Sequence, residues 1–280
     1  MGRQMMTYRE AYEFGSRELE TCGITEAKLD ARLLLEAVCN TNRNDLLVHG
    51  DNPISGEEEG TYREWIAKRA CHIPLQQITG VQEFMGLTFQ VNENVLIPRQ
   101  DTETLVEEAM IEVPDESSVL DLCTGSGCIL LSLMKYKNGI EGLGADISKE
   151  ALCVAEENNR RLGLNARFLQ SDMFDKISGK FDAILSNPPY IRSDVIPTLM
   201  EEVKDHEPLS ALDGKEDGLF FYRILTSQAA EYLQNGGILM VEIGYDQGEE
   251  VFELFRINGY KDIQIINDLA GLQRVVKGRK

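Results

Sequence analysis

Residues 119–128 read VLDLCTGSGC, a short apolar run followed by a glycine-rich turn. The mostly apolar residues that follow, up to about 135, predict a helix, so the turn connects a strand to a helix. Glycines let a backbone approach a ligand closely, and the first turn of a helix offers free N–H groups. In an open α/β sheet, a nucleotide-like cofactor lies at such a loop. No Gly-Lys-Ser/Thr follows, which excludes a P-loop.

Strands and helices alternate from this turn to the end of the chain. This pattern predicts a parallel sheet with right-handed crossovers, and therefore an α/β fold. The last two strands are too close in sequence for a crossover helix, so we expect them to pair antiparallel. The predicted strands are residues 119–122, 142–147, 166–169, 181–185, 238–243, 263–266 and 273–276, and the helices are 129–135, 149–162, 217–233 and 247–255.

The chain before this region has a different pattern. Ser/Thr-x-x-Glu capping boxes begin at Thr7 and Ser55, each ahead of an amphipathic stretch, and predict helices. Apolar and polar residues then alternate around a Met85-Gly86 turn, which predicts a β-hairpin. We therefore expect a helical N-terminal substrate-recognition domain at residues 1–74, a hairpin linker at 75–98 and an α/β domain at 99–280.

The charge of the chain limits its partners. Lys and Arg number 28 against 47 Asp and Glu, for a net charge of −19. Nucleic acids favour basic surfaces, so we expect no direct nucleic-acid partner. A basic protein suits an acidic surface better.

No apolar run approaches the roughly 20 residues of a membrane helix, and the first residues lack the apolar region of a signal peptide. We expect a cytoplasmic protein without membrane contact, acting as a monomer. The six cysteines form no C-x-x-C pair, and the three histidines are far apart. No metal site is therefore predicted.

Two further strand ends supply candidate ligand-binding residues. Asp146 ends the second strand, 19 residues after Gly127, where a carboxylate accepts hydrogen bonds from ribose hydroxyls. Residues 171–173, which include Asp172 and Met173, follow the third strand at a position suited to an adenine ring. Both NAD and S-adenosylmethionine fit these features.

The fourth strand decides between them, because it ends in Asn187-Pro188-Pro189-Tyr190. Two prolines fix the backbone and remove two donors, which leaves carbonyl acceptors. With the Asn187 side-chain carbonyl and the Tyr190 ring, the segment forms a cradle for a planar NH₂ group. Such a cradle directs the nitrogen lone pair of an amide toward an electrophile.

These residues resemble class I S-adenosylmethionine-dependent methyltransferases that modify planar amino groups. Residues 74–80 (PLQQITG), 83–84 (EF) and 96–103 (LIPRQDTE) narrow the resemblance to the peptide chain release factor glutamine methyltransferases. It covers about residues 74–280, and the preceding helices match the family's N-terminal domain in size only.

The resemblance implies a seven-stranded Rossmann-like methyltransferase core that methylates the glutamine amide N5 in the Gly-Gly-Gln motif of release factors. It assigns S-adenosylmethionine, with S-adenosylhomocysteine as product, to Cys123, Thr124, Gly125, Ser126, Gly127, Asp146, Met173 and Asn187. Catalysis and binding of the substrate glutamine fall to Asn187, Pro188, Pro189 and Tyr190.

Two positions depart from the family pattern: Cys123 stands where glycine is usual, and Met173 where an aromatic residue is common. Arg99 and Glu103 are expected either to organise a loop over the cofactor or to form an ion pair at a helix start. The segment from His206 to Pro208 is expected either to line the peptide groove or to form a surface turn.

Two alternatives remain open. The first is a methyltransferase that acts on an amino group of adenine or guanine in DNA or RNA, because the same cradle suits such a group. The second is a protein without catalytic activity that binds the cofactor or serves in an assembly.

Overall fold

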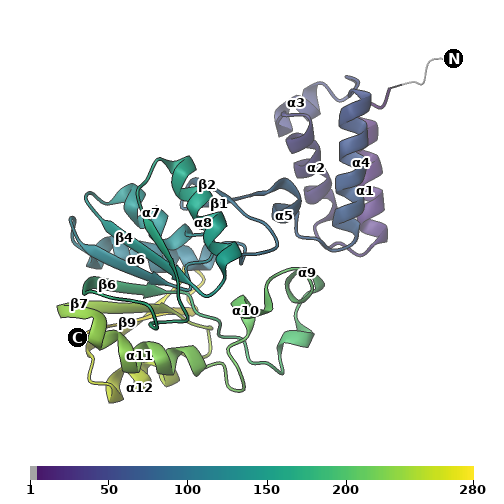
Figure 1. Ribbon diagram of the computed structural model, residues 1–280. Coiled ribbons are helices and arrows are strands. Elements are labelled where there is room, and N and C mark those ends of the chain that lie inside the picture. Colours follow the sequence, from purple (N-terminus) through teal and green to yellow (C-terminus); the bar gives the residue numbers. More distant parts are fainter. Residues whose placement is uncertain (1–4) are drawn as a thin grey trace. The chain divides into compact units, whose positions relative to one another are not determined.

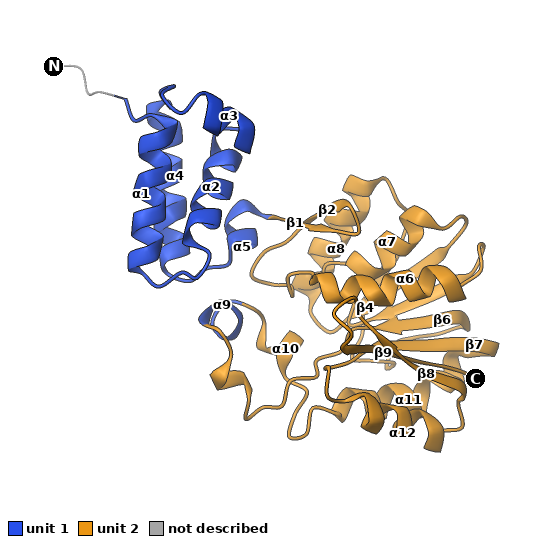
Figure 2. Cartoon of the chain, turned by 180° about the vertical axis from the view of Figure 1, so that it is seen from behind, with its two compact units in different colours: residues 1–80, 201–206 blue, residues 81–200, 207–280 orange. Residues whose placement is uncertain are grey.

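The computed structural model describes residues 5–280 and divides them into two compact units (Figure 2). One unit comprises the chain up to Gly80 together with residues 201–206, and the other comprises residues 81–200 and 207–280. Residues 1–4, which begin the expected helical domain and the stretch judged to lack a signal peptide, lie outside the described residues. Within residues 5–280, no helix is both long and apolar enough to cross a membrane.

The first unit is helical, as its capping boxes predict. Thr7 and Ser55 each accept a hydrogen bond from the backbone of a glutamate three residues later, whose side chain bonds back to the cap. The core gathers Leu19, Leu34 and Tyr62 from three different helices. The helices are α1 (Tyr8–Thr21), α2 (Ala27–Val38), α3 (Arg43–Val48), α4 (Gly56–Ala70), α5 (Leu75–Thr79) and α9 (Glu201–Lys204).

Helix α9 belongs to this unit although the chain on both sides of it belongs to the other. The expected division had placed it in the α/β domain, and the difference arises from tertiary contacts. Arg69, which is buried, binds both Asp30 and Glu202. The His206 ring also contacts the Cys71 carbonyl oxygen at 3.2 Å. No local sequence pattern in residues 201–206 predicts these contacts.

The second unit contains a sheet of seven strands in the order β5-β4-β3-β6-β7-β9-β8. Helices lie on both sides of this sheet (Figure 1). Its first five strands in that order are parallel. The last two strands, β8 and β9, pair antiparallel as expected, and β9 also pairs antiparallel with β7. The strands are β3 (Ser118–Leu122), β4 (Glu141–Asp146), β5 (Arg167–Gln170), β6 (Phe181–Ser186), β7 (Leu233–Glu242), β8 (Lys261–Asn267) and β9 (Gln273–Arg279).

Helices cover both faces of this sheet. Because successive side chains of a strand point to opposite faces, alternate residues of each central strand are buried in two different cores. Val119 and Leu185 pack with α6 and α7, whereas Leu120 and Ile184 pack with α11 and α12. The helices of this unit are α6 (Glu103–Glu112), α7 (Cys128–Tyr136), α8 (Lys149–Leu162), α10 (Leu209–Leu212), α11 (Phe220–Tyr232) and α12 (Gly248–Ile257), with 3₁₀ turns η1 (Gln100–Thr102) and η2 (Ile196–Thr198).

The predicted hairpin is confirmed as β1 (Val81–Phe84) and β2 (Leu87–Gln90). Its two turn residues, Met85 and Gly86, both have positive φ, as a tight two-residue hairpin turn requires. Strand β7 begins earlier than expected. A register shift opposite residues 181–183 lets it start at Leu233 and run through Gly236-Gly237, ahead of the expected start at residue 238.

Candidate active site

The carboxyl ends of β3, β4 and β6 and the loop after β5 surround a cavity of about 320 Å³. In a parallel sheet, the crevice outside these strand ends is where ligands bind. Eight of the sequence-predicted site residues line the cavity: Cys123, Thr124, Gly125, Ser126, Asp146, Met173, Asn187 and Pro189. The remaining three, Gly127, Pro188 and Tyr190, lie outside its lining.

The loop after β3 turns sharply by adopting left-handed backbone at three positions. Cys123, Gly125 and Gly127 have φ of 59°, 54° and 79°. A Cβ on Gly125 would meet no atom within 4 Å, so this glycine faces open space in the cavity. Cys123 adopts the torsion at which glycine is usual, at a cost of roughly 1–2 kcal/mol in backbone strain. The loop therefore keeps its turn despite the cysteine.

Asp121 supports this loop from below. Its side chain is fully buried, and its Oδ2 accepts a hydrogen bond of 2.6 Å from the Thr124 hydroxyl. Burial raises the pKa of Asp121 to about 7, and the charge of Asp146 adds to the effect. Asp121 thus organises the loop and does not line the cavity.

Asp146 connects the end of β4 to the glycine loop. Its Oδ2 accepts from the Gly125 backbone N–H and its Oδ1 from that of Ser148, each at 2.9 Å. Burial raises the pKa of Asp146, and these backbone donors act against that shift. The adjacent Ile147 lines the cavity with 55% of its surface exposed. A carboxylate beside an exposed apolar side chain suits a nucleoside, which presents ribose hydroxyls and a base.

Met173 lies on a tight turn after β5. The Ser171 hydroxyl donates to the Met173 carbonyl oxygen at 2.9 Å and accepts from the Lys176 backbone N–H. Met173 has a φ of 44° and is 8% exposed. The turn therefore places a thioether on the cavity wall.

The Asn187 side chain is held by one end. Its Nδ2 donates to the Thr102 hydroxyl oxygen at 3.3 Å. Within the described part of the chain, neither Asn187 Oδ1 nor the Pro188 carbonyl oxygen accepts a hydrogen bond. Two unused acceptors therefore stand in consecutive residues where β6 ends.

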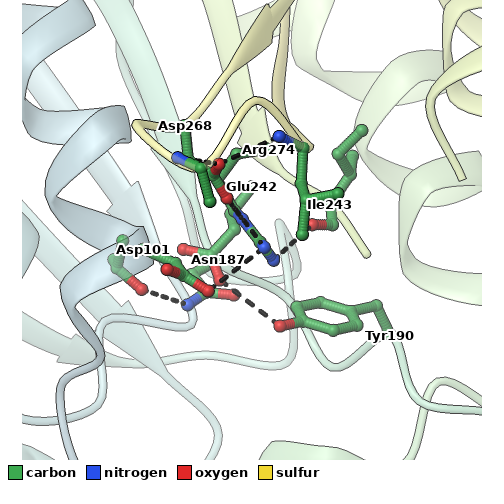
Figure 3. A network of polar contacts seen from close by, with 10 residues as sticks. Asp101, Asn187, Tyr190, Glu242, Ile243, Asp268 and Arg274 are labelled. Carbon is green, nitrogen blue, oxygen red and sulfur yellow. Dashed lines mark hydrogen bonds and ion pairs between the residues drawn. The ribbon is translucent and has the colours of Figure 1, made fainter. Parts of the chain in front are cut away.

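Tyr190 is fixed at both its backbone and its ring. Its carbonyl oxygen accepts from Gln247 Nε2 at 3.1 Å. Its hydroxyl donates to Glu242 Oε1 at 3.4 Å (Figure 3). A Cβ on Gly214 would lie 2.7 Å from the Tyr190 backbone, so this glycine is required for the close approach. The ring position is therefore determined by residues distant in sequence.

Glu242, at the end of β7, is the polar residue of this region that the sequence analysis missed. It is 1% exposed, and burial raises its pKa to about 7, against the effects of the nearby Thr102 hydroxyl and the charge of Arg274. Arg274 is itself buried and pairs with Asp101 and Asp268 (Figure 3). A carboxylate at the carboxyl end of an apolar strand is the signal that singled out Asp146, and it applies equally to Glu242.

Among residues 5–280, no group of three or more His, Cys, Asp or Glu side chains is placed to hold a metal ion.

The comparisons with known proteins cover both units. A family model described as "PrmC N-terminal domain" matches residues 10–80, and one described as "Methyltransferase small domain" matches residues 100–203. The release factor glutamine methyltransferase of Geobacter sulfurreducens is 40% identical over 99% of this chain and 98% of its own length. That of Moorella thermoacetica is 43% identical over 96% of this chain and 97% of its own. The chain belongs to the release factor glutamine methyltransferase family.

Solved structures agree with the methyltransferase fold of this family. A methyltransferase from Pyrococcus furiosus has a TM-score of 0.54 at 17% identity and covers 70% of this chain and 89% of its own. The 16S rRNA N2 G1207 methyltransferase of T. thermophilus, described in complex with AdoMet and guanosine, has a TM-score of 0.50 at 16% identity. It covers 71% of this chain and 49% of its own. At this identity the likeness concerns the fold alone.

The three residues whose roles were open have definite partners. Glu103, in the segment at residues 96–103, accepts from the Met85 backbone N–H at 2.6 Å and so holds the hairpin turn. Arg99 forms an ion pair with the buried Glu207 and not with Glu103. His206 belongs to the helical unit, where its ring contacts the Cys71 carbonyl oxygen, and Pro208 from the same segment lines the cavity.

Proposed function

We propose that this chain transfers a methyl group from S-adenosylmethionine to the side-chain amide nitrogen, N5, of the glutamine in the Gly-Gly-Gln motif of peptide chain release factors. Membership of the release factor glutamine methyltransferase family over nearly the full length supports the substrate. The single structural observation that carries the proposal is the pair of unused acceptors, Asn187 Oδ1 and the Pro188 carbonyl, in consecutive residues after β6, of which Asn187 lines the cavity.

The cavity residues fit S-adenosylmethionine. We assign its ribose to Asp146, its adenine to Ile147 and Met173, and its amino acid end to the loop from Cys123 to Gly127. The open space at Gly125 and the exposed apolar surface of Ile147 support this assignment. When bound, S-adenosylmethionine supplies a methyl group carried on a positively charged sulfur.

The chain's own residues bind and orient the glutamine. An amide NH₂ has two hydrogens in one plane, and Asn187 Oδ1 and the Pro188 carbonyl are suited to accept one each. With both hydrogens held, the nitrogen lone pair is directed out of that plane. Tyr190 closes one side of the slot. The amide nitrogen becomes acidic only as it is alkylated, so no group needs to remove a proton beforehand.

The test is mass spectrometry of a purified release factor after incubation with this protein and S-adenosylmethionine. We expect one added methyl group on the Gly-Gly-Gln glutamine, and none with Asn187→Ala, whose cofactor binding should persist by calorimetry. Absence of the methyl group despite cofactor binding would overturn the substrate assignment. Methylation of adenine or guanine in DNA or RNA under the same conditions would favour the alternative.

A further inference from the structure

Asn187 has two chemically different ends on one flat group, and only one orientation suits the proposed reaction. When Asn187 Oδ1 faces the substrate, it accepts a hydrogen bond from the substrate N–H. When Asn187 Nδ2 faces the substrate, its N–H groups meet those of the substrate, and no hydrogen bond forms. The cradle therefore needs a device that determines which end faces the cavity.

Thr102 is in contact with the donor end. It is 2% exposed, it precedes α6, and its Oγ1 accepts from Asn187 Nδ2 at 3.3 Å. A hydroxyl has one proton. The Thr102 oxygen accepts a hydrogen bond from Asn187 Nδ2 only when its own proton points toward a different acceptor. The orientation of Asn187 thus depends on what receives the Thr102 proton.

Glu242 is the acceptor available for that proton. It accepts from the Tyr190 hydroxyl through Oε1, whereas Oε2 is buried and has no hydrogen-bond partner within the described residues. The Thr102 hydroxyl lies near enough to lower the pKa of the Glu242 carboxyl, and the cationic Arg274 lowers it further. Burial, the largest effect, raises the pKa of Glu242 to about 7. Above that pH the ionised carboxylate only accepts hydrogen bonds, so it directs both hydroxyl protons, of Thr102 and Tyr190, toward itself.

We propose that Thr102 and Glu242 are positioning residues that orient Asn187 with its carbonyl oxygen toward the substrate, and that Glu242 holds the Tyr190 ring at the same time. The inference rests on the proposed function and names two residues for it. It also gives a role to the Asp-Thr-Glu part of the segment at residues 96–103, whose threonine supplies the hydroxyl.

The decisive comparison is Thr102→Val against Thr102→Ser. Valine keeps the shape and removes the hydroxyl, whereas serine keeps the hydroxyl. We expect Thr102→Val to lower kcat/KM for the release factor about 5- to 10-fold, the effect of losing one hydrogen bond. Thr102→Ser should restore it to within about 2-fold, and S-adenosylhomocysteine affinity should stay unchanged in both variants.

The chain offers a matched control in Thr226. This threonine is also buried, and its Oγ1 accepts from Asn258 Nδ2 at 3.2 Å, but it lies on α11 and does not line the cavity. Thr226→Val should leave kcat/KM unchanged even if it lowers stability. Glu242→Gln, which offers one carbonyl oxygen to two hydroxyl donors, should give an intermediate loss.

A second readout does not depend on the substrate. In protein labelled with ¹⁵N-asparagine, the Asn187 side-chain NH₂ signals are identified by their loss in Asn187→Ala. We expect Thr102→Val to shift these signals and Thr102→Ser to leave them close to their positions. If the wild type fails to methylate the release factor, the proposed function fails while this readout still tests the orientation. Unchanged signals and unchanged kcat/KM in Thr102→Val would overturn the inference; if valine prevents folding, Thr102→Ala takes its place.

Discussion

The thiol sulfur of Cys123 lies 3.9 Å from the thioether sulfur of Met173. Both residues have left-handed backbone, with φ of 59° and 44°, and both line the cavity. They are also the two positions at which the resemblance led us to expect a departure from the family pattern. The two departures are therefore in direct contact, so a change at one alters the packing of the other.

Met173 should contribute to cofactor affinity through a thioether–ring contact. Such contacts stabilise by about 0.3–1.5 kcal/mol, so Met173→Ala should weaken S-adenosylhomocysteine binding about 2- to 10-fold. Isothermal calorimetry measures this directly. Met110→Ala, at a partly buried methionine on α6 outside the cavity lining, is the control and should bind normally. Equal affinity for the two variants would rule out the contact.

The left-handed backbone of Cys123 should make this position sensitive to side-chain shape. A β-branched residue is a marked outlier at positive φ, so Cys123→Val should lower the free energy of unfolding by about 1–3 kcal/mol. Cys123→Gly should change it by less than about 1 kcal/mol. Chemical denaturation measures both. Cys153→Val, at an exposed position on α8, controls for the substitution itself, and a Cys123→Val variant as stable as this control would contradict the strain argument.

Asp146 should matter more than any other side chain for cofactor binding. It holds the Gly125 N–H and is assigned to the ribose hydroxyls, and hydrogen bonds to a charged group contribute about 1.5–3 kcal/mol. Asp146→Ala should therefore weaken S-adenosylhomocysteine binding roughly 10- to 100-fold by calorimetry. Asp175→Ala, at an exposed residue outside the cavity lining, should bind as the wild type does. A loss of less than 3-fold would remove Asp146 from the site.

The buried Asp121 should make stability depend on pH. Its pKa is raised from 3.8 to about 7 in the folded state, so between these values the folded protein keeps a proton that the unfolded chain has lost. The free energy of unfolding therefore falls as pH rises through this window. The side chain introduced by Asp121→Asn cannot titrate. The free energy of unfolding of this variant, relative to that of the wild type, should therefore increase by roughly 2–4 kcal/mol between pH 4 and pH 8. Urea denaturation across this range measures the gap, and a constant gap would show that Asp121 does not titrate as argued.

Arg69 should anchor α9 to the other helices of its unit. Arg69→Ala leaves Asp30 buried without its cation, which should cost about 3 kcal/mol of stability in thermal or chemical unfolding. Replacing both partners with apolar residues, Arg69→Met with Asp30→Leu, should recover most of that loss. Glu202→Gln should leave stability nearly unchanged but accelerate amide hydrogen exchange in residues 201–206. Unchanged exchange there would show that the ion pair does not hold α9.

Local pattern was sufficient for most of the fold. The period of the apolar residues located the strands and helices of the sheet, and short spacing predicted the antiparallel β8–β9 pair. Turn chemistry located the hairpin at Met85-Gly86. Pattern failed at α9, at the start of β7 and at residues 75–79, which form helix α5 although they were expected to belong to the hairpin linker. At the first two, a distant partner decides the structure: Arg69 for α9 and the register with β6 for β7.

The sequence by itself determined the fold class, the family and the residues that surround the cavity, because each of these follows from short motifs at the carboxyl ends of strands. Only the tertiary structure decided how the cradle is held. Thr102, Asn187 and Glu242 come from segments up to 140 residues apart, and a hydrogen bond between them has no period or spacing along the chain. Their proximity depends on three chain segments that meet at one edge of the sheet. The Glu242 carboxylate has a raised pKa and fixed hydroxyl partners only because the packing around it excludes water.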